Sequence, residues 1–288
     1  MNKGSVLTIG TFDGVHLGYR KIFHEVVRRA KRLGLTPAAL TFALPPRLFF
    51  FPSNEPALLS TLREKIELMK ACGIKKIHVL KFDAALARVS ARDFFDKYIL
   101  GLCNAKEVVV GYNFGFGRNR EGDSRFLEES GRRNNIGIYI LPPVVNGSVP
   151  ASSGRIRQAL REGNLARANS LLGVSYTLTG KVVMGRKLGR KLGFPTANLK
   201  LSPEKIVPLG VFAVRATLPG GRELKGMANY GRTRTFEVHL FGFSGNLYGK
   251  TLQVRLIRKI RDEKAFTSLH DLSHQLEKDG IKARKMLQ

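Results

Sequence analysis

The apolar pattern of the sequence changes near residue 170, and this change limits the folds that the chain can adopt. Before it, short apolar runs alternate with segments of helical periodicity. Such alternation predicts a parallel sheet covered by helices. After it, apolar runs follow one another with Gly or Pro between them, and no helix-length pattern occurs until Ser268–Met286. This spacing predicts an antiparallel barrel followed by a C-terminal helix.

Five short apolar runs before residue 170 are expected to be the strands of the parallel sheet. They are Ser5–Gly10, Pro37–Phe42, Lys76–Phe82, Glu107–Gly111 and Gly137–Leu141. Helical periodicity follows the first strand and returns at Thr61–Ala71 and Ala91–Leu100. Three prolines between the second strand and the next helix are expected to exclude regular structure there: Pro45, Pro46 and Pro52.

The region after residue 170 is expected to contain at least five strands. They are Ser175–Met184, Val211–Leu218, Lys225–Tyr230, Phe236–Phe243 and Lys250–Ile260. A helical pattern connects the two regions and continues through Leu172. We therefore expect two domains, residues 1–170 with this connector and residues 171–288. A chain of 288 residues is long enough for both.

Composition and charge argue against three kinds of protein: membrane-spanning, disulfide-rich or zinc-binding, and dedicated to nucleic acids. No apolar run approaches the ~20 residues that a bilayer span requires, so no membrane partner is expected. The two cysteines make neither a disulfide framework nor a zinc site, which favours the cytoplasm. The formal charge of +27 is spread out, with 27 Lys and Arg against 14 Asp and Glu up to residue 168, and 22 against 8 after it. Such charge suits anionic ligands, but no recognisable module accompanies it, so dedicated nucleic-acid binding is not expected.

Glycines and cations alternate between Gly180 and Asn198. Glycine lets backbone N–H groups approach a ligand closely, and Lys and Arg supply countercharge for phosphates. The residues expected to cover phosphates are Gly185, Lys187, Gly189 and Arg190. In an extended segment, Thr196 and Asn198 lie on one face, where both oxygens reach one hard cation. For the glycines and lysines alone, the alternative is a basic surface turn.

The segment Pro195-Thr196-Ala197-Asn198, in this setting, resembles the ATP–magnesium loop of riboflavin kinases. The resemblance implies that Thr196 and Asn198 bind Mg²⁺ together with ATP oxygens. It also implies that Glu237 is the general base, which accepts the proton of the riboflavin 5′-hydroxyl.

Other residues near this expected site carry alternatives. The resemblance implies that Arg261 contacts flavin or phosphate, and the alternative is a surface ion pair with Asp262 or Glu263. His239 and Tyr248 are interpreted as structural. The family usually carries a proline and a longer insert before the glutamate strand, whereas the segment before Phe236 here lacks both.

The first strand leads into the turn Phe12-Asp13-Gly14-Val15-His16-Leu17-Gly18-Tyr19 and then into a helix. A strand, a glycine-bearing turn and a helix start form an anion site, because free N–H groups and the helix dipole point at the ligand. This turn resembles the His-x-Gly-His signature of nucleotidyltransferases in the form of bacterial FAD synthetases, with Tyr19 in place of the second histidine. The resemblance implies nucleotide binding by six residues: Phe12, Asp13, Gly14, His16, Gly18 and Tyr19.

Two later segments extend the resemblance to nucleotidyltransferases. Gly111–Gly117 is similar to the glycine-aromatic loop of FAD synthetases, which implies a ligand contact by Asn113. Ser152-Ser153-Gly154-Arg155-Ile156-Arg157 resembles the Ser-Ser-Thr-x-Ile-Arg clasp, which implies nucleotide contacts by Ser153 and Arg157. Gly154 replaces the usual threonine and removes one hydroxyl donor.

In order along the chain, these segments resemble the bacterial bifunctional riboflavin kinase/FMN adenylyltransferase family. Further matching segments are Thr61–Lys65, Leu247–Gly249 and Ile260–Lys264. The resemblance implies a Rossmann-like α/β nucleotidyltransferase domain, then an antiparallel β-barrel riboflavin kinase domain with a C-terminal helix. It implies riboflavin, FMN and ATP as substrates, FAD as the final product, and Mg²⁺ with ATP.

In the adenylyl transfer that this family carries out, His16 is the implied donor to the oxygens of the α-phosphorus. Tyr19 cannot become cationic near neutral pH, because tyrosine titrates near ~10. We therefore expect FAD formation to be slow or absent beside a working kinase. The alternatives are a riboflavin kinase whose first half only binds or regulates, and a basic nucleic-acid-associated protein. The expected assembly is a monomer or a weak oligomer.

Overall fold

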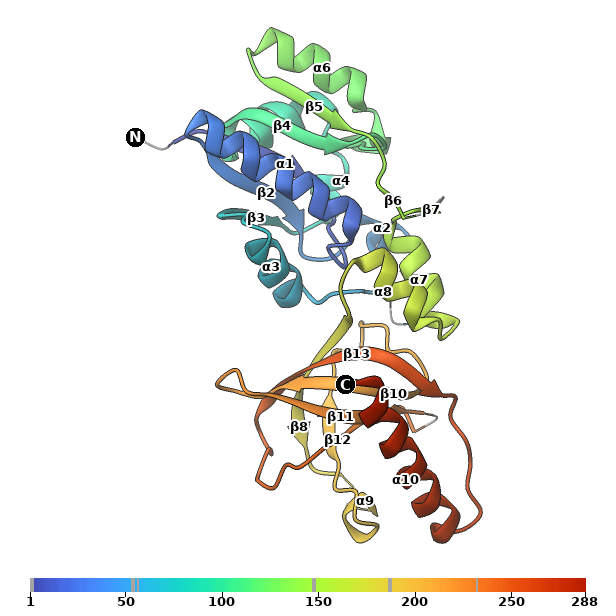
Figure 1. Ribbon diagram of the computed structural model, residues 1–288. Helices are drawn as coiled ribbons and strands as arrows, with labels where there is room; N and C mark the ends of the chain where they lie inside the picture. Colours follow the sequence, from blue (N-terminus) through green and yellow to red (C-terminus); the bar gives the residue numbers. More distant parts are fainter. Residues whose placement is uncertain (1–2, 53–54, 56, 147–148, 186–187, 232) are drawn as a thin grey trace. The chain divides into compact units, whose positions relative to one another are not determined.

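The computed structural model describes residues 3–52, 55, 57–146, 149–185, 188–231 and 233–288. The chain divides into two compact units (Figure 1). The first comprises residues 1–54 and 60–153, and the second comprises residues 55–59 and 154–288. This division comes earlier than the expected boundary near residue 170, because helix α8 (Leu165–Leu172) of the connector packs on strands β8 (Tyr176–Val183) and β13 (Thr251–Arg261).

The first unit is built on a five-stranded parallel sheet in the order β3-β2-β1-β4-β5. Its strands are β1 Ser5–Ile9, β2 Thr36–Phe42, β3 Lys76–Leu80, β4 Ala105–Gly111 and β5 Gly137–Leu141. The five strands expected from the sequence are confirmed. The strand order reverses between β1 and β4, and in such sheets ligands bind at the carboxyl ends of the strands beside that point.

Helices cover both faces of this sheet, and two apolar clusters fill the space beneath them. The helical segments are α1 Leu17–Leu33, α2 Pro46–Phe50, α3 Leu62–Ala71, α4 Ala84–Ala87, α5 Ala91–Phe94 with its π-helical continuation Phe95–Leu102, a 3₁₀ turn Arg118–Arg120, and α6 Ser124–Arg133. A short hairpin, β6 Val145–Asn146 and β7 Val149–Pro150, precedes the second unit.

Helix α2 corrects the expectation that the prolines exclude regular structure. Pro46 occupies the first turn of the helix, where its missing N–H would have had no partner and its fixed φ suits the helix. Leu48 N donates to Pro45 O at 2.9 Å, and Phe51 N donates to Arg47 O at 2.8 Å. The prolines therefore start this helix rather than prevent it.

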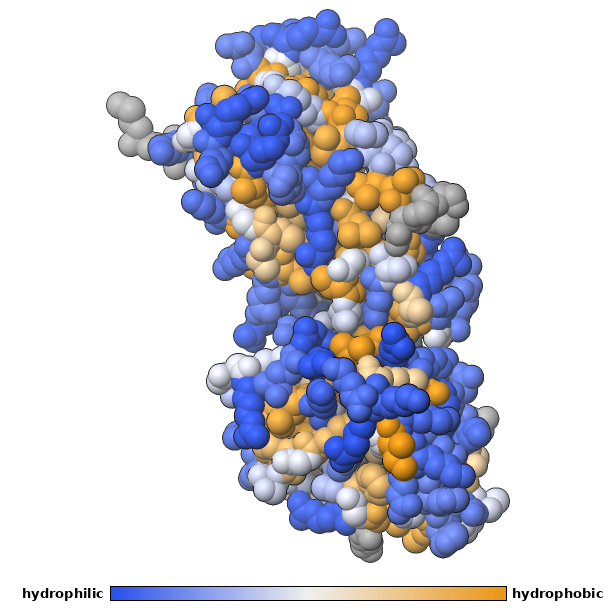
Figure 2. Space-filling view, viewed as in Figure 1, coloured by the Kyte–Doolittle hydropathy of each residue, from blue (hydrophilic) through white to orange (hydrophobic). Residues whose placement is uncertain are grey.

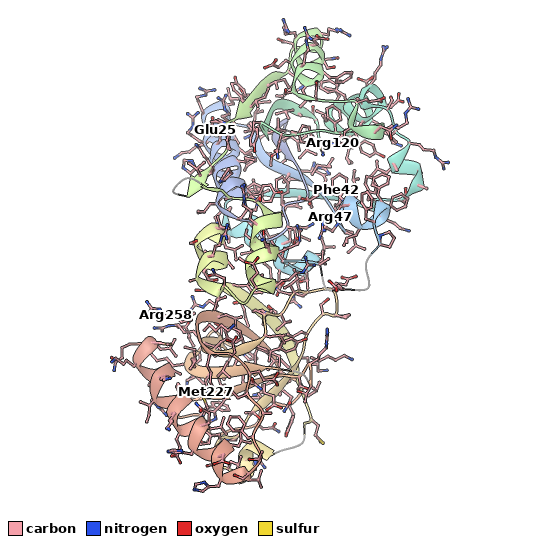
Figure 3. The ribbon with its side chains drawn as sticks, turned by 90° about the vertical axis from the view of Figure 1, so that its right-hand side faces the viewer. Glu25, Phe42, Arg47, Arg120, Met227 and Arg258 are labelled. Carbon is pink, nitrogen blue, oxygen red and sulfur yellow. The ribbon has the colours of Figure 1, made fainter. Side chains whose placement is uncertain are left out.

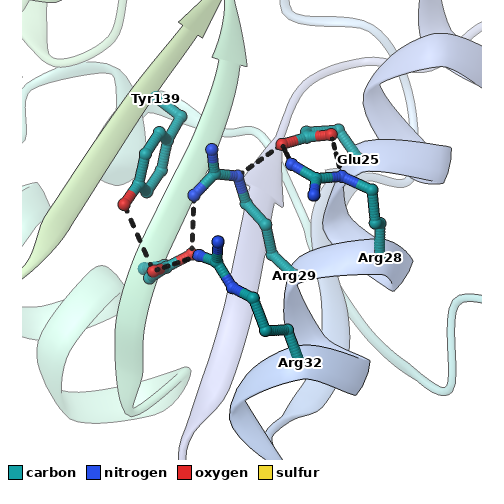
Figure 4. A network of polar contacts seen from close by, with 6 residues as sticks. Glu25, Arg28, Arg29, Arg32 and Tyr139 are labelled. Carbon is teal, nitrogen blue, oxygen red and sulfur yellow. Dashed lines mark hydrogen bonds and ion pairs between the residues drawn. The ribbon is translucent and has the colours of Figure 1, made fainter.

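A charged network fastens α1 to the sheet near the amino end of β4 (Figure 4). Arg29 Nε donates to Glu25 Oε1, and its Nη1 donates to Glu107 Oε2 at 3.3 Å. The Arg29 guanidinium lies 3.0 Å from the ring centroid of Tyr139, whose hydroxyl donates to Glu107 Oε1 at 3.3 Å. The bonds from Arg28 and Arg29 lower the pKa of Glu25 to about 2. This network lies at the opposite end of the strands from the expected ligand site.

The second unit is a closed six-stranded antiparallel barrel in the order β10-β11-β12-β9-β8-β13. Its strands are β8 Tyr176–Val183, β9 Ala197–Lys200, β10 Gly210–Thr217, β11 Glu223–Tyr230, β12 Phe236–Leu240 and β13 Thr251–Arg261. Its helices are α7 Ser153–Arg161, α8 Leu165–Leu172, the single turn α9 Leu188–Lys191 and α10 Leu269–Met286. The predicted barrel and C-terminal helix are confirmed, and β9 is the strand that closes the ring between β12 and β8.

Helix α10 packs on the barrel with part of its apolar face, because Leu276 and Met286 pack against a buried cluster of the barrel whereas two other apolar residues are exposed. Leu269 is 58% exposed and Ile281 is 69% exposed. Asp279, Gly280 and Ala283 are buried instead. The small side chains let the helix approach the barrel closely, and the buried aspartate has a cationic partner described below.

Segment 55–59 leaves the first unit and packs in the second. Leu58 pairs with Lys205, and the amides of Ala57 and Leu58 both donate to Glu204 O, at 2.8 and 2.9 Å. Ile206 N donates back to Leu58 O at 3.0 Å. The chain therefore passes between the units three times, which the sequence did not predict.

The surface agrees with the composition. On the face shown in Figure 2, hydrophilic residues cover most of the surface of each unit. Within the described residues, no helix is both long and apolar enough to cross a bilayer. Cys72 and Cys103 are both free thiols, and burial raises the pKa of Cys103 to about 12.

Candidate functional site

Thr196, Asn198 and Glu237 come together on the barrel. Strands β9 and β12 are antiparallel neighbours, and Asn198 stands directly opposite Glu237. Opposed residues of an antiparallel pair point to the same face. Thr196 Oγ1 donates to Glu237 Oε2 at 3.4 Å, and Asn198 is 8% exposed. One hydroxyl, one amide and one carboxylate therefore line a single small region.

Two glycines pack tightly beside this region. A Cβ at Gly185 would lie 2.2 Å from Asn198 Nδ2, so the backbone there lies against the amide of Asn198. A Cβ at Gly189 would lie 2.3 Å from Phe194 O, and Phe194 N donates to Gly189 O at 2.8 Å. Both positions exclude any larger residue without a shift of the loop.

The two expected phosphate-binding cations near these glycines differ in what can be described. Arg190 is exposed in α9. Lys187 lies outside the described residues. Of the four residues expected to cover phosphates, the structure therefore describes Gly185, Gly189 and Arg190.

His239 joins the loop of Pro195 to strand β12. Its Nδ1–H donates to Pro195 O at 2.9 Å, and its ring stands edge-on to Phe194 at 5.3 Å. Burial lowers the pKa of His239, so the ring is neutral near neutral pH. This side chain fixes the residue before Thr196, in keeping with its interpretation as structural.

The turn after β1 has a strained backbone. Phe12 has φ of 50° and Val15 has φ of 41°, and both side chains are buried. Non-glycine residues rarely adopt positive φ, and such residues persist where the surrounding structure holds them. Asp13 helps to hold this turn, because its Oδ1 accepts from Ser60 N at 2.9 Å and from Ser60 Oγ at 3.2 Å. Gly14 N donates to Ser60 Oγ at 3.0 Å.

His16 precedes α1 as its N-cap residue and is 5% exposed. Its ring stacks on Tyr19, with centroids 4.0 Å apart. The Tyr19 ring also stands edge-on to Phe12 at 5.1 Å, and its hydroxyl lies 3.4 Å from Thr11 Oγ1. A Cβ at Gly18 would lie 3.1 Å from the His16 ring, so this position is closely packed. Tyr19 therefore supports both the turn and the His16 ring.

The remaining residues expected in the nucleotidyltransferase site divide between the two units. Ser153 Oγ donates to Asp13 O at 2.9 Å, so it meets the turn. Asn113 is exposed just beyond the carboxyl end of β4, and its carbonyl accepts from Arg120 Nη2 at 3.1 Å. Arg157 belongs to the second unit, where it is buried and its Nε donates to Ala57 O at 2.7 Å.

Comparison with known proteins matches both units. The FAD synthetase family model matches residues 1–155, and the riboflavin kinase family model matches residues 172–287. The bifunctional riboflavin kinase/FMN adenylyltransferase of Escherichia coli (strain K12) is 37% identical over 290 residues, covering 98% of this chain and 93% of that protein. The chain belongs to the bifunctional riboflavin kinase/FMN adenylyltransferase family. The Bacillus subtilis (strain 168) member is 35% identical and covers 97% of this chain and 91% of its own length.

A solved structure also shares the fold of this family member over nearly its whole length. It is described as a macrolide-efflux protein from Streptococcus pneumoniae, and its TM-score against this chain is 0.86. The two sequences are 31% identical, and the match covers 97% of this chain and 93% of that one.

In this member of the family, Arg261 binds Asp279 of α10. Arg261 Nε and Nη2 donate to Asp279 Oδ2 at 2.9 and 2.7 Å, and the Asp279 side chain is fully buried. Gln275 Nε2 donates to Asp279 Oδ1 at 2.9 Å. Arg261 therefore pairs with a buried carboxylate of α10, while its Nη1 donates to the backbone oxygen of Asp262 at 2.9 Å. The only sequence signal for its true partner was an aspartate on the helix face that meets the barrel.

Three aromatic residues that sequence reasoning did not single out are exposed after β2. Phe49, Phe50 and Phe51 are 42, 56 and 78% exposed. Phe49 and Phe50 stand edge-on to Phe82, with centroids 5.5 and 5.7 Å away. They lie at the end of α2, which follows β2; Figure 3 labels Phe42 at the end of the strand and Arg47 in the helix. A run of three phenylalanines after two prolines was the available signal.

Proposed function

We propose that the barrel unit phosphorylates riboflavin to FMN and that the first unit adenylylates FMN to FAD. The observation that carries this proposal is the meeting of Thr196, Asn198 and Glu237 on the barrel. The turn Phe12–Tyr19 at the carboxyl edge of a parallel sheet supports the second activity. The two activities share a product and a substrate, because the FMN made by the barrel is what the first unit consumes.

In the kinase step, Glu237 accepts the proton of the riboflavin 5′-hydroxyl. The hydroxyl oxygen then forms a bond to the γ-phosphorus of ATP. The bond from that phosphorus to the bridging oxygen breaks, and ADP leaves. Gly185 and Gly189 allow the backbone to approach the phosphates, and Lys187 and Arg190 supply countercharge.

The residues at this site fit Mg²⁺. Thr196 and Asn198 offer a hydroxyl and an amide oxygen, which are the kind of ligand that this hard cation takes. The described residues contain no cluster of three His, Cys, Asp or Glu that could hold a metal, so ATP oxygens and water would complete the shell. Bound Mg²⁺ would neutralise charge on the transferring phosphoryl group.

In the adenylyl step, a phosphate oxygen of FMN forms a bond to the α-phosphorus of ATP, and pyrophosphate leaves. His16 and the amides at the start of α1 donate hydrogen bonds to the oxygens of that phosphorus. The exposed rings of Phe49, Phe50 and Phe51 offer a surface for the planar isoalloxazine of FMN.

We further propose a cytoplasmic monomer or weak oligomer that has small-molecule partners only. The absence of a nucleic-acid-binding module and of an apolar run of bilayer length in the sequence supports this proposal. Size-exclusion chromatography with light scattering tests the oligomeric state directly.

Incubation with riboflavin, ATP and Mg²⁺ followed by chromatography tests the main proposal. FMN together with FAD supports it, whereas FMN alone favours a kinase with a binding or regulatory first unit. If neither product forms, both readings fail. A nucleic-acid-associated protein would then require retention on RNA or DNA that falls steeply with salt.

Gly185→Ala is expected to lower FMN formation by about 10- to 100-fold. The added Cβ would lie 2.2 Å from Asn198 Nδ2 and would displace this amide, and a 1 Å displacement can cost about 100-fold in rate. Steady-state FMN formation at varied ATP measures the effect. Gly154→Ala is the control for a glycine-to-alanine change, since a Cβ at Gly154 in helix α7 would meet nothing within 4 Å and its φ is not positive. Equal losses in both variants would contradict the proposed packing.

Tyr19→His is expected to raise FAD formation by about 10- to 150-fold, because it restores one charged hydrogen bond to the phosphate site. FMN formation by the barrel should not change. FAD made from added FMN and ATP measures the effect. An unchanged rate would show that Tyr19 does not limit the adenylyl transfer, and that its contacts with His16 and Phe12 serve only the turn.

A further inference from the structure

Lys65 of α3 is a buried cation at the carboxyl edge of the parallel sheet. It is 3% exposed. Its Nζ donates to Phe42 O at 2.6 Å and to Thr11 O at 3.1 Å. Phe42 is the last residue of β2, and Thr11 follows the end of β1 by two residues. The Lys65 ammonium group therefore donates hydrogen bonds at the ends of both strands, next to the Phe12–Tyr19 turn.

Burial of this ammonium does not serve stability. Both of these hydrogen-bond acceptors are neutral carbonyls, which offset the loss of water around a buried ammonium less than a bonded carboxylate would. Burial lowers the pKa of Lys65 to about 8, against the smaller opposing effect of Asp13. The unfolded chain therefore binds more protons between pH 8 and 10.5, and charging Lys65 weakens the fold below that range.

The carbonyl that Lys65 binds belongs to the residue before the strained turn. Thr11 O also accepts from Thr41 Oγ1 at 3.2 Å. The next residue, Phe12, has φ of 50°. Conformations of this kind are unfavourable for residues other than glycine and need support from their surroundings. Ser60 supports the turn through Asp13 and Gly14, whereas Lys65 supports it at its entrance.

We propose that Lys65 is a positioning residue of the adenylyltransferase, because it fixes the Thr11 carbonyl and so holds the Phe12–Val15 turn in the form that receives the ATP phosphates. This inference rests on the proposed adenylyl transfer at that turn. It gives a role to the last residue of the Thr61–Lys65 segment, whose Thr61 and Glu64 form the capping box of α3.

Lys65→Met tests the proposal, with Lys70→Met as the matched control on the exposed side of the same helix. FAD formation from FMN should fall about 10- to 100-fold through kcat in Lys65→Met, because charged hydrogen bonds to the turn are lost. The KM for FMN should change little. FMN formation from riboflavin, measured in the same preparations, should match wild type in both variants.

The pH profile separates positioning from simple packing. In wild type, FAD formation should fall as pH rises through about 8, where Lys65 loses its proton. The charged group that acts on it is Asp13 on the turn, which opposes the effect of burial. Lys65→Met should lack this alkaline loss. If FAD formation by Lys65→Met still fell as pH rose through about 8, the proposal would be overturned.

Hydrogen exchange gives a readout that does not depend on activity. The amides of Phe12–Val15 should exchange faster in Lys65→Met, while those of β1 and the thermal midpoint should not fall. A lower midpoint with faster exchange throughout the first unit would make Lys65 an ordinary core residue and would overturn the proposal. If wild type forms no FAD, the proposed function fails, and local exchange alone then decides the role of Lys65.

Discussion

Glu237→Gln is expected to lower riboflavin phosphorylation by about 10²- to 10⁴-fold, which is the usual contribution of a general base. Glutamine keeps the shape of the side chain and a hydrogen-bond acceptor for Thr196 Oγ1, but it cannot take the proton of the 5′-hydroxyl. The register of β12 against β9 should remain, because backbone bonds set it. Initial rates of FMN formation with saturating riboflavin, ATP and Mg²⁺ measure the loss.

Two controls show whether the loss of FMN formation comes from removal of the general base. FAD formation from added FMN should be unchanged, since it takes place in the first unit. Glu223→Gln removes a carboxylate from the neighbouring strand β11, where it pairs with Arg215 and Arg255 away from Thr196. That variant should keep FMN formation within about threefold of wild type, as half-exposed ion pairs contribute little. A Glu237→Gln enzyme with more than a tenth of the wild-type rate would refute the assignment of the base.

His16→Asn is expected to lower FAD formation by about 10²- to 10³-fold, the typical cost of removing one preorganised donor to a developing oxyanion. Asparagine is a favourable residue at a helix N-cap, so the start of α1 should be retained. FMN formation by the barrel should not change. The rate of FAD formation from FMN, ATP and Mg²⁺ is the measurement.

His24→Asn is the control for this variant. His24 is an exposed residue of the same helix, and its replacement should leave both rates near wild type. Full FAD formation by His16→Asn would exclude His16 from the reaction. The adenylyl transfer would then depend on the backbone amides of the turn and on residues from other segments.

The sequence predicted most of the fold because its signals are local. Apolar runs of strand length marked all five strands of the parallel sheet and five of the six barrel strands. The missed barrel strand, β9, has only four residues, and the turn α9 stands shortly before it. Pro46 was read as a helix breaker because the sequence alone does not say that it stands at a helix start.

The meeting of Thr196, Asn198 and Glu237 was also predictable, because Thr196 and Asn198 alternate in one extended segment and a family pattern pointed to Glu237. The contacts that hold the Phe12–Tyr19 turn could not be predicted from the sequence. Ser60 binds Asp13 across 47 residues, and Lys65 binds Thr11 across 54. Periodicity carries no information about contacts at such separations. The family pattern implied nucleotide binding by Asp13, but it gave no sign that its Oδ1 accepts two hydrogen bonds from Ser60.

The path of residues 55–59 bears on how this enzyme can be dissected. A gene fragment that starts at codon 154 would encode a barrel without Leu58, which pairs with Lys205, and without Ala57, whose carbonyl accepts from buried Arg157. The complementary fragment would carry those same residues as an unpaired loop. Expressing either activity alone therefore calls for a transplanted 55–59 peptide rather than a single cut.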